Sequence, residues 1–149
     1  MFKVLFCTDF SDNASTAFDY AIDAAGRRDG AELHLLHVLQ EPDAQFWQQY
    51  VYAGDEQPEK SAQRSFDEMV ASEYTPRVPA DIKFQPVLRF GKSYVEIIKY
   101  ADQIGANLIV MGRQGRGALH SLFFGTVAEK VVKRASCAVL VIPMIGKTE

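Results

Sequence analysis

The feature that most constrains the fold is a regular alternation between short apolar runs and longer segments with helical spacing. Five runs have the length and the β-branched and aromatic content of strands, namely residues 2–7, 32–39, 81–90, 107–111 and 137–143. Between them the sequence predicts helices at 15–26, 58–74, 93–105 and 121–135. This order predicts a doubly wound α/β fold, in which about four helices cover both faces of a five-stranded, mainly parallel sheet. The 149 residues have the usual size of one domain, so we expect a single domain over 1–149.

Three of the predicted strands indicate their own places in the sheet. The runs NLIVM at 107–111 and AVLVI at 138–142 contain almost no polar residue, which is typical of central parallel strands buried on both faces. Pro86 lies inside the run 81–90, and because proline cannot donate to a strand ladder, it predicts an edge strand or a bulge. The final run is also expected to form a sheet edge, and an exposed edge invites pairing with a second chain.

Composition and charge exclude several classes of partner. With 48% hydrophobic and 23% charged residues, the chain is expected to form an ordinary globular protein. The net charge is −3 and the basic residues are scattered along the sequence, so we expect neither nucleic acid nor a membrane as a partner. No apolar run approaches the roughly 20 residues that cross a bilayer, and no signal-peptide pattern develops, so we expect a cytoplasmic protein.

The cysteines and histidines do not predict a metal site. Cys7 and Cys137 are far apart in sequence and lie at the ends of apolar runs, which favours buried thiols over a disulfide. His34 and His37 lie three residues apart in a predicted strand, so their side chains should point to opposite faces of the sheet. A zinc site is therefore not expected.

A glycine-rich loop follows the fourth predicted strand. In the stretch MGRQGRGALHSLFFGTV, starting at Met111, glycines occupy 112, 115, 117 and 125 between a strand and a helix. Glycines let backbone N–H groups approach a ligand closely, and a helix that begins beside them attracts anions. In an open parallel sheet, ligands bind beyond the carboxyl ends of the strands, where the strand order reverses. The loops after the first and fourth strands are thus the candidate site, and phosphate is the expected ligand group.

The loop matches neither of the two familiar nucleotide patterns. No Lys-Ser or Lys-Thr follows a glycine at the spacing of the G-x-x-x-x-G-K-[ST] loop. The first strand leads into TDFSDN, which lacks glycine, so the dinucleotide pattern G-x-G-x-x-G is also absent there. Both of these classes of nucleotide-binding protein are excluded.

The spacing that is present resembles the ATP-binding signature of the universal stress protein family: Gly112, two residues, Gly115, nine residues, then Gly125-Thr126. The resemblance extends over the whole chain, through VLFCTDFSDNA, HLLHVL and GTVAEKVVKRASCAVLVIP. It implies a doubly wound fold of five strands, usually a homodimer, in a family divided between members that hold ATP and members that do not. The complete glycine signature resembles the ATP-holding branch.

Carried over position by position, the resemblance implies a nucleotide site. Asp9, with Thr8 beside it, would face the ribose or adenine end, and Val38 would pack on the base. The remaining residues would surround the ribose and the phosphates: Met111, Gly112, Arg113, Gly115, Arg116, Gly125, Thr126 and Val127. ATP would carry Mg²⁺ on its phosphates, and the homodimer would form through the last strand, Ala138 to Ile142.

The chain departs from the family pattern at two positions. Cys7 stands where many members have proline, which affects the shape of the adenine pocket, and Ala138 follows Cys137 where Cys-Pro is common. Three predicted site residues also have a simpler interpretation. Asp9 could cap the first helix, although Ser11, Asp12 and Asn13 can cap it as well. The two arginines of the loop, Arg113 and Arg116, could simply be solvated.

Three readings of function remain open from the sequence. The first is an ATP-binding regulatory module that acts as a dimer, with at most slow ATP hydrolysis, because no strong general base accompanies the glycine loop. The second is a nucleotide-free dimeric interaction protein, in which the glycines serve only the loop geometry. The third is an ATP-dependent adenylating enzyme. Such an enzyme needs a substrate pocket, and only the segment from Gln40 to Glu59 lies outside the predicted strands, helices and glycine loop and could form one.

Overall fold

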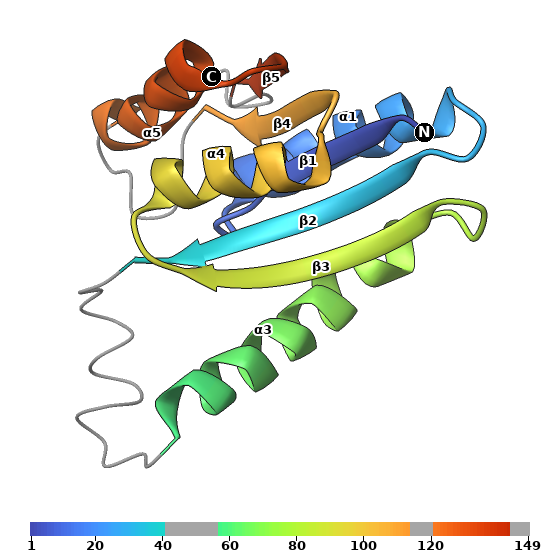
Figure 1. Cartoon of the computed structure of the whole chain (residues 1–149). Coiled ribbons are helices and arrows are strands. Elements are labelled where there is room, and N and C mark those ends of the chain that lie inside the picture. Colours follow the sequence, from blue (N-terminus) through green and yellow to red (C-terminus); the bar gives the residue numbers. More distant parts are fainter. Residues whose placement is uncertain (41–56, 114–120, 144–149) are drawn as a thin grey trace, which may run out of the picture.

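The computed structural model describes residues 1–40, 57–113 and 121–143, the side chains of 121–125 excepted. Within these ranges the strands β1 to β5 form one fully parallel sheet (Figure 1). The strands are β1 (Lys3–Cys7), β2 (Glu32–Leu39), β3 (Lys83–Phe90), β4 (Leu108–Gly112) and β5 (Ala138–Ile142). The helices are α1 (Asp12–Gly26), α3 (Pro58–Glu73), α4 (Ser93–Ile104) and α5 (Ser121–Arg134), with a short 3₁₀ turn η2 (Thr75–Arg77) after α3. The predicted doubly wound α/β fold is confirmed.

The strand order is β3-β2-β1-β4-β5. The chain starts in the centre of the sheet, adds β2 and β3 on one side, and then crosses over to add β4 and β5 on the other. The order therefore reverses between β1 and β4. In sheets of this kind the crevice at the reversal is where ligands bind, beyond the carboxyl ends of the strands.

Helices cover both faces of the sheet, and a hydrophobic cluster lies under each pair. On one face α1 and α3 bury a cluster that includes Phe6, Phe18, Leu35 and Tyr74. On the other face α4 and α5 bury a second cluster with Leu5, Ile109 and Val131. Figure 1 shows α3 and α4 on opposite sides of the sheet. Successive residues of β1 alternate between the two clusters, as expected for a strand covered on both faces.

The edges of the sheet confirm two predictions and correct one. β3 carries Pro86 and is an edge strand, and β5 is the opposite edge. β4 is almost fully buried, as its apolar sequence predicts. The prediction that AVLVI is buried on both faces is wrong, because Ala138 and Leu140 are exposed. An edge strand has a neighbour on one side only, and a surface groove between α1 and β5 leaves the Leu140 side chain 38% exposed.

Capping residues set the limits of two helices. α1 begins three residues before its predicted start, because the hydroxyl of Ser11 accepts a hydrogen bond from the Ala14 N–H at 3.1 Å. α4 ends at Gly105, whose left-handed backbone, with φ +67, closes the helix. The start of α1 and the end of α4 are therefore fixed by these residues.

Candidate functional site

The candidate site lies at the carboxyl edge of the sheet, between β1 and β4. Cys7 at the end of β1 pairs with Met111 near the end of β4. The chain segments that follow, Thr8 to Ser11 and Gly112 to Arg113, therefore start side by side at the strand-order reversal. The structure thus brings Thr8 and Asp9 to the same edge of the sheet as Met111 and Gly112.

Thr8 is buried and its polar groups are used inside the protein. Its hydroxyl lies 2.7 Å from the hydroxyl of Tyr74 and accepts a hydrogen bond from the Phe10 N–H at 2.9 Å. The Thr8 carbonyl accepts a hydrogen bond from Nδ1 of His37 at 2.7 Å. Because a carbonyl oxygen only accepts, the proton of this imidazole is on Nδ1. These contacts direct the Thr8 side chain toward α3 and fix the start of the loop.

Phe10 adopts a backbone conformation that non-glycine residues rarely use, with φ 64. Its ring packs against His37, Phe66 and Tyr74, with ring centroids 5.0, 6.2 and 5.8 Å away. A left-handed backbone at a bulky residue costs about 1–3 kcal/mol and persists only where the surrounding structure enforces it. The aromatic contacts from β2 and α3 therefore hold this loop in its shape.

Asp9 is half-buried at the surface of the same loop. One of its carboxylate oxygens accepts a hydrogen bond from the Ser11 N–H at 3.0 Å. The N-cap of α1 is Ser11 and not Asp9, which confirms that a neighbouring residue can take the capping role. Asp9 consequently tightens the turn that follows β1.

Gly112 is required by the packing of α1 against β4. A Cβ built on this glycine would lie 2.9 Å from the amide carbon and oxygen of the buried Asn13 side chain. The Asn13 amide donates a hydrogen bond to the carbonyl of Ile142 at 3.2 Å, and the Arg113 N–H donates to the same carbonyl at 2.7 Å. Sequence reasoning considered Asn13 only as a capping residue. A polar side chain inside the first turn of α1 was the one signal that could have indicated its role.

The structure places the other predicted residues as follows. Met111 is buried in the α4/α5 cluster, so only its backbone can face a ligand. Val38 and Val127 are partly buried against the same cluster, whereas Thr126 and Arg113 are exposed. Gly115 and Arg116 lie outside the described residues, and so do the surroundings of Gly125.

The structure agrees with the sequence in two respects: Cys7 is buried, and His34 and His37 lie on opposite faces of the sheet. His34 contacts Tyr100 of α4, while His37 contacts Phe66 of α3, so the two imidazoles point to opposite faces. Cys7 is buried and burial raises the pKa of its thiol; Cys137 is half-buried, and both are free thiols. The described part of the chain contains no group of three or more His, Cys, Asp or Glu side chains that could hold a metal ion.

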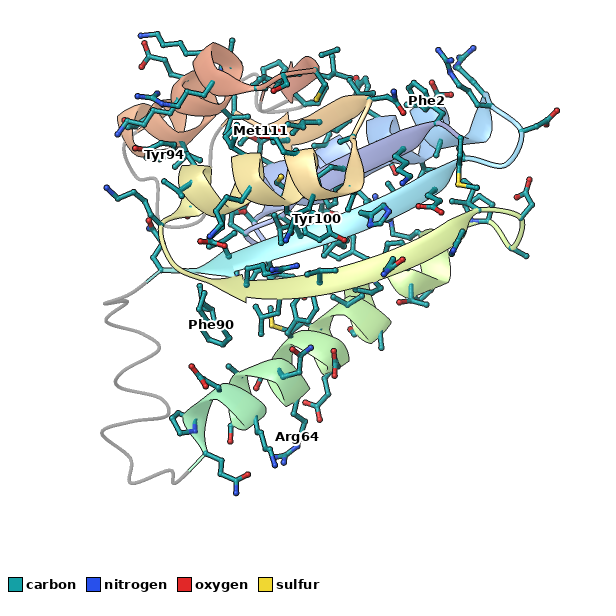
Figure 2. All side chains as sticks on the ribbon, in the orientation of Figure 1. Phe2, Arg64, Phe90, Tyr94, Tyr100 and Met111 are labelled. Atoms are coloured by element: carbon teal, nitrogen blue, oxygen red, sulfur yellow. The ribbon has the colours of Figure 1, made fainter. Side chains whose placement is uncertain are left out.

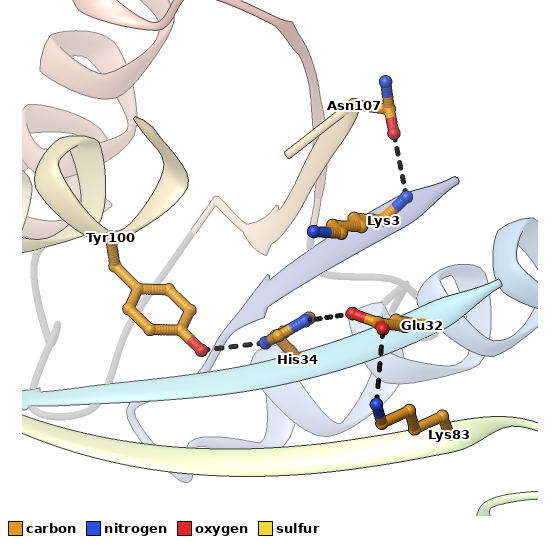
Figure 3. Close-up of polar contacts among 6 residues, drawn as sticks. All are labelled: Lys3, Glu32, His34, Lys83, Tyr100 and Asn107. Atoms are coloured by element: carbon orange, nitrogen blue, oxygen red, sulfur yellow. Dashed lines mark hydrogen bonds and ion pairs between the residues drawn. The ribbon is translucent and has the colours of Figure 1, made fainter. Parts of the chain in front are cut away.

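A second polar network lies at the amino half of the sheet, away from the candidate site (Figure 3). The buried His34 lies 2.8 Å from the Tyr100 hydroxyl through Nδ1 and 3.0 Å from Glu32 through Nε2. Glu32 also pairs with Lys83 at 3.5 Å. The hydrogen bond with His34, and then the charge of Lys83, hold the pKa of Glu32 below its usual value. The network joins α4, β2 and β3 and has a structural role.

Among the described residues, no helix is long and apolar enough to span a membrane.

The protein SH1215 of Staphylococcus haemolyticus is 32% identical over 143 residues, which cover 94% of this chain and 83% of that protein. The solved structure of MJ0577, a universal stress protein of Methanocaldococcus jannaschii, superposes with a TM-score of 0.75 at 25% identity over 98% of both chains. A universal stress protein of Archaeoglobus fulgidus, solved in complex with dAMP, shares the fold with a TM-score of 0.62 at 21% identity, over 95% and 97% of the two chains. The profile of the universal stress protein family matches residues 1–143, and the chain belongs to that family.

Proposed function

We propose that this universal stress protein binds ATP at the carboxyl edge of the sheet, between the ends of β1 and β4. The observation that carries the proposal is the register of these strands, which sets the Asp9 loop beside Gly112 at the strand-order reversal. Support also comes from the glycine spacing and from the family, in which one protein of the same fold was solved with dAMP.

The described residues fit an adenine nucleotide in part. The half-buried Asp9 carboxylate can accept hydrogen bonds from ribose hydroxyls or from the adenine amino group, and the partly buried Val38 offers an apolar surface for the base. Gly112 and Met111 would contribute backbone groups, since the Met111 side chain is in the core. Thr8 would act through the loop that it anchors, because its hydroxyl already bonds Tyr74.

The phosphates would lie toward the start of α5. The residues that would contact them are Arg113, Gly115, Arg116, Gly125, Thr126 and Val127. Mg²⁺ would be held by the phosphate oxygens together with water, because the described residues supply no cluster of ligands for it. The ion would neutralise phosphate charge.

The protein would act in the cytoplasm as a regulatory module of a homodimer. β5 is an edge strand with exposed Ala138 and Leu140, so a second copy can pair with it and cover both side chains. Nucleotide turnover would be slow at most, since no general base is assigned beside the phosphates.

A nucleotide-free dimeric interaction protein is the second candidate. Two observations favour it: the Thr8 hydroxyl is bonded internally, and Gly112 is explained by the contact with Asn13 alone. In this case β5 would be the functional surface, and the glycines would serve only packing and loop geometry.

Identification of the native ligand separates the two candidates. The purified protein is denatured, and released nucleotides are identified by chromatography and mass spectrometry; stripped protein is then titrated with ATP by calorimetry. Two results would support ATP binding: ATP among the nucleotides that the denatured protein releases, and a lower ATP affinity in the Asp9→Asn variant. Asn at this position keeps the shape and can still accept the hydrogen bond from Ser11, so a loss reflects the carboxylate charge. Stripped protein that ignores millimolar ATP would favour the interaction protein.

A further inference from the structure

Three cationic side chains converge on one aromatic ring where the start of α4 meets α5. The ring is that of Tyr94, in the first turn of α4 (Figure 2). Lys92 Nζ lies 5.8 Å from the ring centroid, Lys130 Nζ lies 4.8 Å away, and Arg134 Cζ lies 5.1 Å away. Lys92 precedes α4, whereas Lys130 and Arg134 are one turn apart on α5. We call these four residues the Tyr94 cluster.

The three cations of the Tyr94 cluster differ from two other lysines of α4 and α5, which form ion pairs. Lys99 and Lys133, on the same two helices, are paired with Glu96 at 3.6 Å and Glu129 at 3.4 Å. None of the three cations of the Tyr94 cluster forms an ion pair within 4.0 Å in the described part of the chain. Since the whole chain has a net charge of −3, this local excess is not a consequence of a basic composition.

Like charges held near one ring repel one another, to an extent that solvent and salt reduce. The face of an aromatic ring attracts cations but only weakly at an exposed site, and Lys92 and Arg134 are exposed. An anion with several oxygens offsets the repulsion better. A planar guanidinium and two ammonium groups are the side chains that bind phosphate groups, by paired hydrogen bonds and by point charge.

The position of the cluster links it to the nucleotide. Lys130 follows Thr126, a proposed phosphate contact, by one helical turn, so the two side chains lie on the same side of α5. Lys92 lies at the carboxyl edge of the sheet, where the chain leaves β3 and enters α4. Tyr94 and Val127 both pack against the hydrophobic cluster under α4 and α5.

We propose that Lys92, Lys130 and Arg134, arranged on Tyr94, form a subsite for the distal phosphates of the nucleotide, an inference that rests on the function proposed above. The subsite makes the protein selective for phosphate chain length. Affinity falls in the order ATP, ADP, AMP because only the longer chains reach the cations.

The test compares two charge-matched variants. Lys130→Gln with Arg134→Gln removes two positive charges from the subsite, and Lys99→Gln with Lys133→Gln removes two from paired lysines on the same helices. Calorimetry gives the affinity of wild type and both variants for ATP, AMP and inorganic tripolyphosphate. Lys99, Lys133 and Arg134 are exposed and Lys130 is half-buried, and thermal unfolding checks that both variants fold.

The expected result is loss of selectivity in the subsite variant alone. Its ATP affinity falls about tenfold or more, since a charge-assisted contact contributes on that order, while its AMP affinity stays within about twofold of wild type. Equal ATP affinity in wild type and the subsite variant, or an equal loss in the paired-lysine variant, overturns the subsite. If wild type binds no nucleotide but binds tripolyphosphate through Lys130 and Arg134, ATP binding is refuted while the anion subsite stands. If wild type binds neither ligand, both proposals fail.

Discussion

The hydroxyl of Thr8 lies 2.7 Å from the hydroxyl of Tyr74, a residue 66 positions away in sequence. Tyr74 directly follows α3 and is fully buried, with its ring against Phe10 and Phe18. This one contact ties the end of α3 to the loop that carries Asp9. A helix far from the glycine signature therefore helps to set the shape of the candidate site.

Tyr74→Phe should weaken ATP binding by up to about fivefold, because up to about 1 kcal/mol that orders the loop is lost with the hydroxyl bond. Tyr100→Phe is the matched control, since it removes the hydroxyl of another buried tyrosine, 2.8 Å from His34 in the other network. Each variant should lose about 1 kcal/mol of unfolding free energy in urea titrations. Calorimetry with ATP should then separate them, and equal affinities in the two variants would contradict the role of Tyr74.

Gly112→Ala should destabilise the protein by about 1–3 kcal/mol, because the new methyl group would meet the buried Asn13 side chain at 2.9 Å. Gly26→Ala, at the end of α1, is the control: no atom lies within 4 Å of the added Cβ. The second change should be neutral or stabilising by up to about 1 kcal/mol, because alanine favours helix. Denaturant unfolding of both variants measures the difference, and similar stabilities would refute the close approach.

The contribution of Glu32 to the free energy of unfolding should be lost at acidic pH. Its pKa is lowered in the folded protein, first by the hydrogen bond with His34 and then by the charge of Lys83. A carboxyl with a lowered folded pKa stabilises the protein above its unfolded pKa of about 4.3, and this contribution is lost as the pH falls through the folded value.

Glu32→Gln should therefore be less stable than wild type at pH 6 to 7, and the gap should narrow as the pH falls below about 4. Glu129→Gln removes an exposed carboxylate paired with Lys133 and should change stability by less than about 1 kcal/mol at any pH. Urea unfolding across the pH range tests both variants. A gap that does not depend on pH would assign the effect of Glu32 to packing.

Leu140→Glu should disrupt the proposed homodimer, because it places a charge on the exposed side of the edge strand β5. The dissociation constant should rise by about tenfold or more, as expected for a charge buried without a partner in an interface. Val132→Glu, at an α5 position that is 52% exposed, is the comparison and should leave the dimer intact. Sedimentation equilibrium measures the dissociation constant of both variants. An unchanged dissociation constant in Leu140→Glu would show that the interface lies elsewhere.

The order of the elements was predictable from the sequence because each strand and helix has its own local signal. β2 has its predicted limits, and Pro86 identified an edge. The exposure of β5 was not predictable from AVLVI, since an apolar run does not reveal how far α1 extends over it. Burial there depends on tertiary packing and not on the run itself.

The candidate site was predictable only where its residues are close in sequence to strand ends. Asp9 and Gly112 follow β1 and end β4, so the topology alone brings them together. Tyr74 and Asn13 act through contacts between distant segments, and no pattern in one sequence reports such contacts. For the same reason the basic residues look scattered along the chain, although three of them meet at the Tyr94 ring.

The carbonyl of Ile142, the last residue of β5, accepts hydrogen bonds from Asn13 of α1 and from the Arg113 N–H just after β4. The last residue of the strand proposed for subunit pairing is thus hydrogen-bonded to Arg113, a residue proposed to contact the nucleotide. A shift of Arg113 on binding would change the free energy of β5 pairing, and by linkage the assembly of two chains would change ATP affinity by the same factor. One acceptor atom would couple occupancy and oligomeric state.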